Sequence, residues 1–305
     1  MTELLKDRTA IVTGAGGGLG RCHALELARH GARVVVNDLA GRDNGAGARA
    51  VADEIRAQGG RAIAVLGDVT RMDDMDELAS RTLDEWGRID ILVNNAGILR
   101  DKTFAKMSLD EFRQVLDVHV MGSVHATKAV WAQMQEQQFG RIVMTTSSSG
   151  LYGNFGQSNY GAAKMALVGF MQTLALEGAK RNIRVNCLAP SAATGMTAGV
   201  LPPEALALLG PEAVSPGLLA LVADDAPTRM ILLAGAGSFE AAHITMTQGA
   251  HFGHGPDVAE RVRSELDTVR SRANETVPGS GWEQYQRELE KAQAQAQAQA
   301  PAGVL

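Results

Sequence analysis

Several features that define whole classes of protein are scarce in this sequence. Only two cysteines, Cys22 and Cys187, occur in 305 residues. That number is too small for a disulfide framework or for a cysteine-ligated zinc or iron–sulfur site, so we expect two buried, reduced thiols. Basic and acidic residues nearly balance, which leaves a formal net charge of -5. Because no field of one sign is present to attract nucleic acid, we expect neither DNA nor RNA as a partner.

Long apolar runs are also missing. No uninterrupted hydrophobic segment is long enough to span a bilayer. The first residues, MTELLKDRTAIVTG, contain no basic stretch followed by an apolar run, as a secretory signal would require. We therefore expect a soluble protein of the cytoplasm, without a membrane partner. The hydrophobic content of 45% is nevertheless ample for a buried core.

Short runs rich in β-branched residues recur along the chain, with helix-like segments between them. The runs are apolar without alternation, as expected for strands that are buried on both faces of a sheet. The segment from Leu19 to Arg29 is typical of the intervening helices, because its apolar residues share one face. This alternation of strands and helices predicts an α/β protein with a doubly wound parallel sheet in three layers (α/β/α). The predicted strands are Thr9 to Val12, Arg33 to Asn37, Ala62 to Leu66, Ile91 to Asn94, Arg141 to Thr145, Arg184 to Leu188 and Arg229 to Leu233.

The regular alternation weakens in the last third of the chain. Prolines and glycines interrupt the helical pattern there, which predicts a mobile lid over about 195–216. An amphipathic helix is predicted from about Pro256 to Arg272, and the Ala–Gln repeat at the end predicts a frayed helix or disorder. We expect a main domain of residues 1–250 that includes the lid, a C-terminal helical extension of residues 251–290, and a low-complexity tail of residues 291–305.

A glycine-rich loop, Thr13 to Gly20, follows the first predicted strand and opens a helix. Glycine lets the backbone turn sharply and approach a pyrophosphate, whose charge the free N–H groups and the positive end of the helix would face. Leu19 stands where a G-x-G-x-x-G motif needs its third glycine, so the loop fits T-G-x-x-x-G-x-G instead. A glycine-rich turn can lack a ligand, but the strand, loop and helix context favours a dinucleotide site in a Rossmann-type fold. The candidate cofactor-binding residues in the loop are Gly14, Gly16, Gly18, Leu19 and Gly20.

An acidic residue, Asp38, stands at the end of the second predicted strand, about twenty residues beyond the glycine loop. A carboxylate at this place accepts hydrogen bonds from the adenosine ribose hydroxyls and repels a ribose phosphate. Gly16 and Gly17 leave the loop without a basic residue, so the sequence favours NAD over NADP as the cofactor. Arg42 is the signal against this choice, because a nearby guanidinium can pair with a phosphate.

Tyr160 and Lys164 are four residues apart in a predicted helix, so their side chains share one face. A tyrosine hydroxyl titrates at a pKa of about 10, and a nearby ammonium lowers that pKa. We expect Lys164 to supply this field and also to hold the nicotinamide ribose. The activated phenol would take the proton of an alcohol, or return it when a carbonyl is reduced. By itself such a pair is more often a surface contact, so the catalytic interpretation depends on a third residue.

That third residue is Ser147, which follows the predicted strand Arg141 to Thr145. Open α/β sheets bind ligands at this edge, where the hydroxyl can hydrogen-bond the reacting oxygen. Ser148 and Ser149 are adjacent alternatives, and serines in such clusters often serve turns instead. Together the serine, the tyrosine and the lysine predict an oxidoreductase that moves a hydride and a proton between a hydroxyl or carbonyl substrate and the nicotinamide.

These motifs together resemble the short-chain dehydrogenase/reductase family, over the chain to about residue 240. The matching positions are Thr13 to Gly20, Asp68-Val69, Asn94-Asn95-Ala96-Gly97, Ser147, Tyr160-x-x-x-Lys164 and Pro190-Ser191. In this family the residue at Asp68 contacts adenine, and a threonine that Thr194 matches touches the nicotinamide carboxamide. The resemblance implies cofactor contacts at Asp68, Val69, Asn95, Ala96, Gly97, Pro190 and Thr194, besides Tyr160 and Lys164.

Two positions depart from the family pattern. His119 replaces an asparagine that is the fourth catalytic residue and positions a water near the lysine. The histidine could carry the proton relay itself or only fill space, and we include it with Ser147, Tyr160 and Lys164 among the candidate catalytic residues. Ser191 replaces a glycine, which we expect to change only a turn.

Within the family, the chain is similar to the (3R)-hydroxyacyl-CoA dehydrogenase domains of the peroxisomal multifunctional enzymes type 2, also called 17β-hydroxysteroid dehydrogenases type 4. The matching phrases are VVVNDL, NNAGILRD and GLYGNFGQ, together with a histidine at His119. The likeness implies oxidation of a (3R)-3-hydroxyacyl-CoA, with a fatty or steroid side chain, to the 3-oxoacyl-CoA. Hydratase and sterol-carrier domains are missing and the chain does not end in Ser-Lys-Leu, so we expect a stand-alone bacterial counterpart.

The same motifs are also compatible with other functions. A 3-oxoacyl carrier-protein reductase shares most of them but generally uses NADPH, against which Asp38 argues. A 17β-hydroxysteroid dehydrogenase acting on free steroid would fit the same pocket, and a catalytically silent NAD-sensing or scaffold protein would share the fold. Family members usually associate through two long helices, here near Leu109 to Met134 and Ser158 to Gly178, so we expect a homodimer or a tetramer.

Two weaker signals concern ligands. His243, His251 and His254 match no zinc spacing, so we expect no metal site. Arg100 and Lys102 follow the Asn-Asn-Ala-Gly turn and could meet the phosphates of coenzyme A, although exposed basic side chains are usually only solvated.

Overall fold

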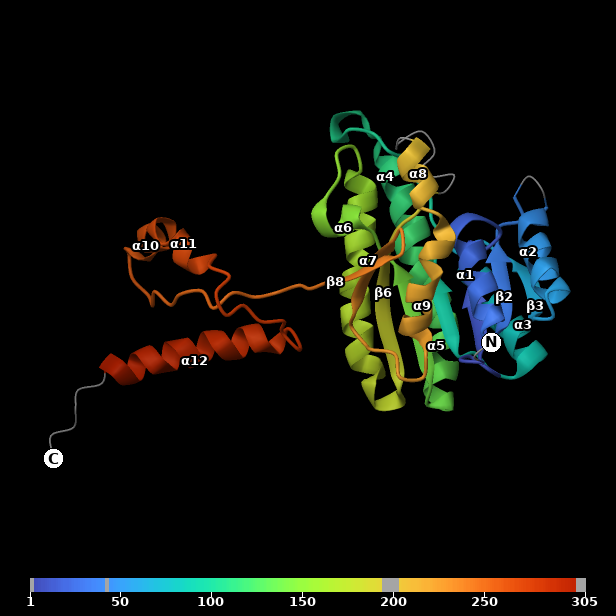
Figure 1. Ribbon diagram of the computed structural model, residues 1–305. Helices are drawn as coiled ribbons and strands as arrows, with labels where there is room; N and C mark the ends of the chain where they lie inside the picture. Colours follow the sequence, from blue (N-terminus) through green and yellow to red (C-terminus); the bar gives the residue numbers. More distant parts are fainter. Residues whose placement is uncertain (1–2, 42–43, 194–202, 300–305) are drawn as a thin grey trace. The chain divides into compact units, whose positions relative to one another are not determined.

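One sheet of eight strands forms the centre of the main unit in the computed structural model, which describes residues 3–41, 44–193 and 203–299 (Figure 1). The strands are β1 (Thr9–Val12), β2 (Arg33–Asp38), β3 (Arg61–Leu66), β4 (Ile91–Asn94), β5 (Gly140–Thr145), β6 (Ile183–Ser191), β7 (Ile231–Gly235) and β8 (Ser238–Ala242). Their order is β3-β2-β1-β4-β5-β6-β7-β8. Each pair from β3 to β7 is parallel, and β8 is antiparallel to β7. The doubly wound parallel sheet predicted from the sequence is confirmed, with one antiparallel strand added at its edge.

Successive side chains of each strand point to opposite faces of the sheet. In β1, Ala10 and Val12 belong to one buried cluster, whereas Ile11 between them belongs to the other. The neighbouring strand repeats the pattern, since Val34 and Val35 of β2 belong to different clusters. Both faces of the sheet are therefore apolar, which explains why these strands are unbroken hydrophobic runs in the sequence.

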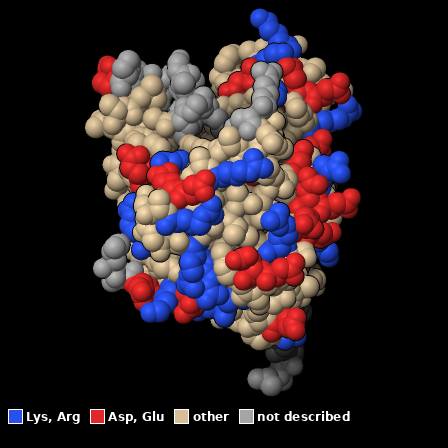
Figure 2. All heavy atoms as spheres, turned by 90° about the vertical axis from the view of Figure 1, so that its right-hand side faces the viewer, with Lys and Arg blue, Asp and Glu red and all other residues tan. Residues whose placement is uncertain are grey.

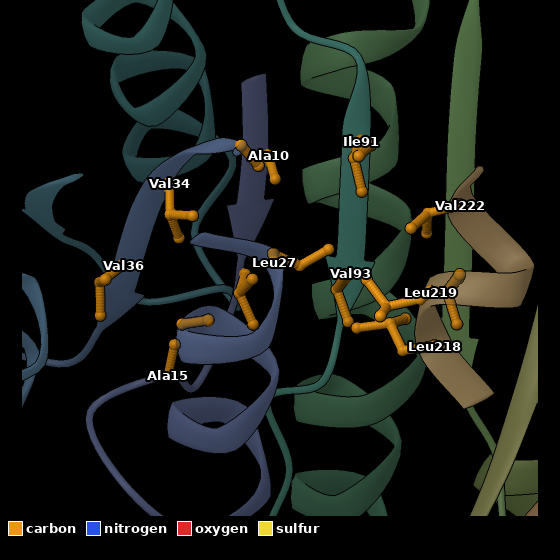
Figure 3. Close-up of a cluster of buried hydrophobic side chains, with 14 of the residues drawn as sticks. Ala10, Ala15, Leu27, Val34, Val36, Ile91, Val93, Leu218, Leu219 and Val222 are labelled. Carbon is orange, nitrogen blue, oxygen red and sulfur yellow. The ribbon is translucent and has the colours of Figure 1, made fainter. Parts of the chain in front are cut away.

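Helices cover both faces of the sheet. One layer contains α1 (Gly18–Arg29), α2 (Ala46–Ala57) and α9 (Ser215–Val222), and the other contains α3 (Met72–Trp86), α5 (Gly122–Gln137) and α7 (Ser158–Gly178). Figure 3 shows the cluster on the first side, where Leu27 of α1, Val93 of β4 and Leu218 of α9 meet. The expected three layers are present.

The long helix expected from Leu109 to Met134 is interrupted. It consists of α4 (Leu109–Leu116), the π-helical turn η2 (Asp117–Met121) and α5. A capping box starts α4, because Ser108 Oγ accepts from Glu111 N at 3.2 Å and the Glu111 carboxylate accepts from Ser108 N at 3.0 Å. A π-helical turn inserts a residue into the helical ladder, and such turns are frequent at functional sites.

Short elements connect the main helices and strands. Four of them are η1 (Phe104–Lys106), α6 (Ser148–Tyr152), η3 (Ala179–Arg181) and η4 (Pro211–Ala213). The region expected to form a lid contains η4 and α8 (Pro203–Leu208), while 194–202 lie outside the described residues.

Residues 243–305 form a second compact unit, separate from the main unit of residues 1–242. In its described part the helices are α10 (Val258–Ser264), α11 (Leu266–Val269) and α12 (Trp282–Gln299). Two short helices thus replace the single helix predicted from Pro256 to Arg272, since Glu265 leaves the helical conformation between them. The Ala–Gln repeat continues α12 to Gln299, which is the helical one of the two alternatives predicted for it. Alanine and glutamine are both good helix formers.

Basic and acidic side chains lie intermixed on the face of the molecule that Figure 2 shows. Ion pairs join such charges locally, as Arg21 of α1 and Glu54 of α2 do at 2.6 Å. Across the described ranges, no helix is both long and apolar enough to cross a bilayer.

Candidate active site

A cavity of about 1340 Å³ lies at the carboxyl ends of the parallel strands. Open α/β sheets bind ligands at this edge, beside the place where the strand order reverses, which here lies between β1 and β4. The candidate residues in its wall are Gly14, Gly18, Leu19, Gly20, Asp38, Asp68, Val69, Asn95, Ala96, Gly97, His119, Ser147, Tyr160, Lys164 and Pro190. Of the other two candidates, Gly16 lies next to the wall and Thr194 lies outside the residues that the structure describes. The fold therefore gathers nearly all of the predicted site.

The glycine loop leaves space where side chains would collide with the backbone. A Cβ added at Gly14, whose φ is +63°, would lie 2.8 Å from Ala96 Cα, and one at Gly20 would lie 2.3 Å from the carbonyl oxygen of Gly14. In the described part of the chain no side chain caps the first turn of α1, which begins at Gly18. The free N–H groups and the positive end of the helix therefore face the cavity, as a pyrophosphate needs.

Asp38 points back at the glycine loop. Its Oδ2 accepts from Gly16 N and its Oδ1 accepts from Leu39 N, both at 2.8 Å. These two bonds hold the half-buried carboxylate at the end of β2, and each oxygen keeps a lone pair for a further donor. The arrangement fits the hydroxyls of an adenosine ribose. Arg42, the signal for a ribose phosphate, lies outside the described residues.

Asn95, directly after β4, stabilises the glycine loop by hydrogen bonds. Its side-chain amide donates to the carbonyl oxygens of Thr13 and Gly14 at 2.9 and 3.1 Å. Thr13 Oγ1 in turn accepts from the backbone N–H groups of Asn95 and Ala96, both at 3.1 Å. The Asn-Asn-Ala-Gly turn and the glycine loop are thus joined by four hydrogen bonds.

Asp68 and Val69 lie beyond β3, on the expected adenine side. Asp68 Oδ1 accepts from Thr70 N at 2.9 Å and from the Thr70 hydroxyl at 2.8 Å. Val69 packs against Gly122 at the start of α5, where an added Cβ would lie 2.6 Å from Val69 Cγ2. A second cavity of about 350 Å³ shares Leu39 and Asp68 with the larger one. This geometry leaves room for a flat ring at the edge of β2 and β3.

Ser147 and Tyr160 meet at the inner end of the large cavity. Ser147 is the residue before α6, Tyr160 lies in the first turn of α7, and the Ser147 side chain is near enough to the phenol to affect its pKa. Burial raises the pKa of Tyr160, the Ser147 side chain opposes that rise, and the Asp101 carboxylate adds to it. Of the adjacent serines, Ser148 is exposed, while the buried Ser149 donates from its hydroxyl to Gln157 Oε1 at 2.8 Å.

Lys164 lies one turn further along α7 and is buried. Its Nζ donates to the carbonyl oxygen of Thr145 at 2.6 Å and lies 5.4 Å from the centre of the Tyr160 ring. Burial lowers the pKa of Lys164 to about 7. The expectation that Lys164 lowers the pKa of Tyr160 is therefore wrong for this arrangement. The desolvated amine is held by a backbone carbonyl beside the ring, and the pKa of Tyr160 is raised.

His119 occupies the π-helical turn η2 and is 2% exposed. Its Nε2 lies 2.8 Å from the carbonyl oxygen of Ile98 and 3.1 Å from Ile98 N. The ring packs edge-on against Tyr160, with 5.3 Å between ring centres. Burial lowers the pKa of His119 to about 3, so the imidazole is neutral at physiological pH. Within the described chain its Nδ1 is buried without a hydrogen-bond partner.

The wall opposite the glycine loop contains polar residues that sequence reasoning missed as site residues. They are Asp101, Gln114, Asn154 and Gln157. Asp101 ends the phrase NNAGILRD, Asn154 and Gln157 lie in the phrase GLYGNFGQ, and Gln157 is one helical turn before Tyr160, but no site role was assigned to them. Arg100 also lines this wall, with its guanidinium bonded to Leu99 O and Gln114 Oε1.

The structure also shows what surrounds the residues considered for binding coenzyme A phosphates and a metal ion. Lys102 forms an ion pair with Glu111 of the α4 capping box, so its charge is already engaged. Among the described residues, no three histidine, cysteine, aspartate or glutamate side chains gather as metal ligands would.

Comparison with known proteins places the chain in a family. The family model described as short chain dehydrogenase matches residues 8–204. The chain belongs to this family of oxidoreductases. Among curated relatives, a short-chain type dehydrogenase/reductase of Mycobacterium tuberculosis is 49% identical over 84% of this chain and 92% of its own length.

Two further relatives have more specific names. Peroxisomal multifunctional enzyme type 2 of Mus musculus is 48% identical over 70% of this chain, which spans 29% of that enzyme. A 3-oxoacyl-[acyl-carrier-protein] reductase of Synechocystis is 46% identical over 63% of this chain and 77% of its own length.

Two solved structures share the fold closely. Full-length peroxisomal multifunctional enzyme type 2 from Drosophila melanogaster superposes with a TM-score of 0.79 at 35% identity, over 95% of this chain and 50% of that one. A 7α-hydroxysteroid dehydrogenase complexed with NADH and 7-oxo glycochenodeoxycholic acid gives a TM-score of 0.69 at 31% identity, over 77% of this chain and 96% of that one.

Proposed function

We propose that this chain oxidises a (3R)-3-hydroxyacyl-CoA, with a fatty or steroid side chain, to the 3-oxoacyl-CoA, with NAD as the cofactor. The observation that carries the proposal is that Ser147, Tyr160 and Lys164 line the same cavity as the glycine loop and Asp38. The likeness to the peroxisomal multifunctional enzymes type 2 supports the substrate class.

In this proposal the two hydroxyl side chains handle the proton. Ser147 hydrogen-bonds the substrate oxygen, and Tyr160 takes the proton in oxidation or gives it in reduction. Because burial raises the pKa of Tyr160, the phenol is protonated at neutral pH. The site is thus prepared to give a proton at neutral pH, and it takes one more readily as the pH rises.

Lys164 and His119 lie next to the Tyr160 ring and hold it in position. Lys164 is fixed by Thr145 O and is proposed to hold the nicotinamide ribose. His119 is neutral and anchored to Ile98, so its ring fixes one side of Tyr160. We propose it as a positioning residue at the end of the proton relay.

NAD supplies the ring that accepts the hydride when it is bound. The uncapped start of α1, with Gly14, Gly16, Gly18, Leu19 and Gly20, would hold its pyrophosphate, and Asp38 would accept from the adenosine ribose hydroxyls. Asp68, Val69, Asn95, Ala96, Gly97, Pro190 and Thr194 are the further proposed contacts. The Asp38 carboxylate favours NAD over NADP, because it would repel a ribose phosphate.

Two other activities have specific support. The Synechocystis relative favours a 3-oxoacyl carrier-protein reductase, and the hydroxysteroid dehydrogenase structure favours a free steroid substrate. The test is to offer the purified protein (3R)-hydroxyacyl-CoA, (3R)-hydroxyacyl carrier protein and free 17β-hydroxysteroids, each with NAD and with NADP. Our proposal predicts the highest kcat/KM for the CoA thioester with NAD. A preference for the carrier protein with NADP, or for the free steroid, would replace it with the corresponding alternative.

Binding of NAD without turnover of any of these substrates would indicate a silent sensing or scaffold protein. A homodimer or tetramer, a cytoplasmic location, and the division into residues 1–250, 251–290 and 291–305 stay predictions from the sequence.

A further inference from the structure

A series of polar side chains lines the cavity wall beside the serine–tyrosine pair. Gln157 Nε2 donates to Asp101 Oδ2 at 2.7 Å, and Gln157 Oε1 accepts from the Ser149 hydroxyl at 2.8 Å. Ser149 Oγ accepts in turn from Asn154 Nδ2 at 2.9 Å. All four residues belong to the wall of the large cavity. We call these four residues the Gln157 network.

The carboxylate at one end fixes the direction of every bond in the Gln157 network. An ionised carboxylate only accepts hydrogen bonds, so the end of Gln157 that faces Asp101 must be the NH₂ group. The carbonyl end of Gln157 then faces Ser149, whose hydroxyl must donate to it. Asn154 can supply the hydrogen that Ser149 Oγ accepts. The amide of Gln157 therefore cannot turn over without losing its bond to Asp101 and placing its oxygen against the carboxylate.

Backbone contacts hold the two loops of the Gln157 network together. Lys102 N donates to Gly156 O at 2.9 Å, next to Asp101 and Gln157 respectively. The fully buried Asn159 donates from its side chain to Arg100 O at 3.0 Å. The loop after β4 and the start of α7 thus form one rigid part of the wall, although Gln157 and Asp101 are 56 residues apart.

One donor of the Gln157 network is left for a ligand. A primary amide has two N–H bonds, and only one of them points to Asp101. No residue in the described part of the chain accepts the second. Gln157 directly precedes α7, one helical turn ahead of Tyr160, and Ser149 stands two residues after Ser147. The free N–H therefore belongs to the wall next to the two residues proposed to hold the reacting oxygen.

We propose that Gln157 recognises a carbonyl oxygen in the β position to the reacting hydroxyl, which makes the site selective for 3-hydroxyacyl thioesters. The inference rests on the proposed function and names the group that sets its substrate class. A 3-hydroxyacyl thioester has its hydroxyl on C3 and its carbonyl on C1. Ser147 and Tyr160 take the first oxygen, and Gln157 donates to the second.

The polarity of the Gln157 network is the reason for this choice of ligand group. A thioester carbonyl can only accept a hydrogen bond, and Asp101 keeps Gln157 as a donor. A site with a committed donor disfavours an analogue that lacks the acceptor, since the N–H of the half-buried Gln157 then has no partner on the ligand. A simple secondary alcohol offers no such acceptor.

The test compares two ligands that differ only in the carbonyl. One is a (3R)-3-hydroxyacyl-CoA, and the other is the matching 3-hydroxyalkyl-CoA thioether, in which a methylene replaces the carbonyl. The kcat/KM of each is measured, or the inhibition constant of the thioether where it is not turned over. The preference for the thioester is the ratio of the two values. The variants are Gln157→Met, Asp101→Asn and, as a matched control, Gln133→Met.

Each variant has a distinct expected result. Gln157→Met keeps the length of the side chain but removes the N–H, so the preference for the thioester should fall about tenfold. Asp101→Asn frees the Gln157 amide to turn over, so the preference should fall in the same direction but less. Gln133 is also half-buried, with its amide bonded to Gln137 in α5 and outside the cavity, and its variant should keep the preference of the wild type. Melting temperatures and NADH binding check that each variant is folded.

Failure of the inference and failure of the proposed function give different results. A preference that is the same in Gln157→Met and in the wild type overturns the inference but leaves the proposed dehydrogenase in place. A fall of equal size for both ligands assigns Gln157 a structural role and also overturns the inference. A wild-type protein that neither turns over nor binds the thioester overturns the proposed function, and the inference with it.

Discussion

Replacing Asp38 by asparagine should shift the cofactor preference from NAD towards NADP. The Asp38 carboxylate accepts from Gly16 N and Leu39 N, and we propose that it also accepts from the adenosine ribose. Asparagine has the same shape, but its NH₂ end cannot accept. At least one of these bonds is therefore lost. A hydrogen bond to a charged group is worth about 1.5–3 kcal/mol, so NAD binding should weaken about tenfold to a hundredfold.

The same substitution removes a repulsion against NADP. Two unit charges at about 4 Å interact by about 4 kcal/mol near a protein surface. Because Asp38 is only half-buried, solvent screens the repulsion, and we expect about 1–2 kcal/mol of repulsion to remain. NADP binding should therefore tighten about tenfold. Together the two effects lower the ratio of NAD to NADP affinity by about a hundredfold to a thousandfold.

The assay is a fluorescence titration of the wild type and Asp38→Asn with NADH and with NADPH. Asp53→Asn is the matched control, because Asp53 is an exposed acid on α2 whose partner is Arg56. The control should keep the cofactor preference of the wild type. The reasoning is refuted if Asp38→Asn keeps the wild-type ratio of the two dissociation constants, because the carboxylate would then not face the ribose.

Three further predictions concern the catalytic wall and the core. Because burial raises the pKa of Tyr160 above its ordinary value of about 10, kcat/KM for oxidation, which needs the deprotonated phenol, should rise with pH up to at least about 10, whereas kcat/KM for reduction should not change with Tyr160 over that range; an oxidation profile that is flat there would contradict this. His119→Gln places its amide near the position of Nε2, can bond Ile98 there and should retain activity, whereas His119→Ala should lose about tenfold or more in kcat; equal rates for the two variants would remove His119 from the mechanism. Leu27→Ala empties a fully buried position of α1 and should lower the free energy of unfolding by about 2–5 kcal/mol in urea. Leu176→Ala, at a 49% exposed position, should cost less than about 1 kcal/mol, and equal losses would refute the assignment of the core.

The strands that the sequence predicts are those with buried, unbroken apolar runs. β1 and β4 match the prediction at both ends, and β8 was missed. β8 has the sequence SFEAA, most of which is exposed, so it has no apolar run to detect. It forms because Ala236 and Gly237, with φ of 49° and 77°, make the tight turn that returns the chain alongside β7. Edge strands of this kind depend on their neighbour more than on their own side chains.

The candidate site was predictable where each residue belongs to a local pattern. The glycine loop, Asp38 and the Tyr160–Lys164 pair all have fixed spacings that indicate their place in the fold. The effect of Lys164 on Tyr160 was predicted wrongly, because it depends on where Nζ points, and Thr145 O holds Nζ beside the ring. The contact of Asp101 with Gln157 was not predicted, since no spacing in the sequence relates residues from two separate loops.

The central claim is that Tyr160 exchanges the proton of a (3R)-3-hydroxyacyl-CoA while NAD is reduced. The direct measurement is NADH formation from (3R)- and (3S)-3-hydroxyacyl-CoA by the wild type and by Tyr160→Phe, which removes only the hydroxyl. The account predicts turnover of the (3R) thioester by the wild type and a loss of at least about a hundredfold in the variant, with NADH binding retained. Turnover of the (3S) thioester instead, or a variant as active as the wild type, would contradict it.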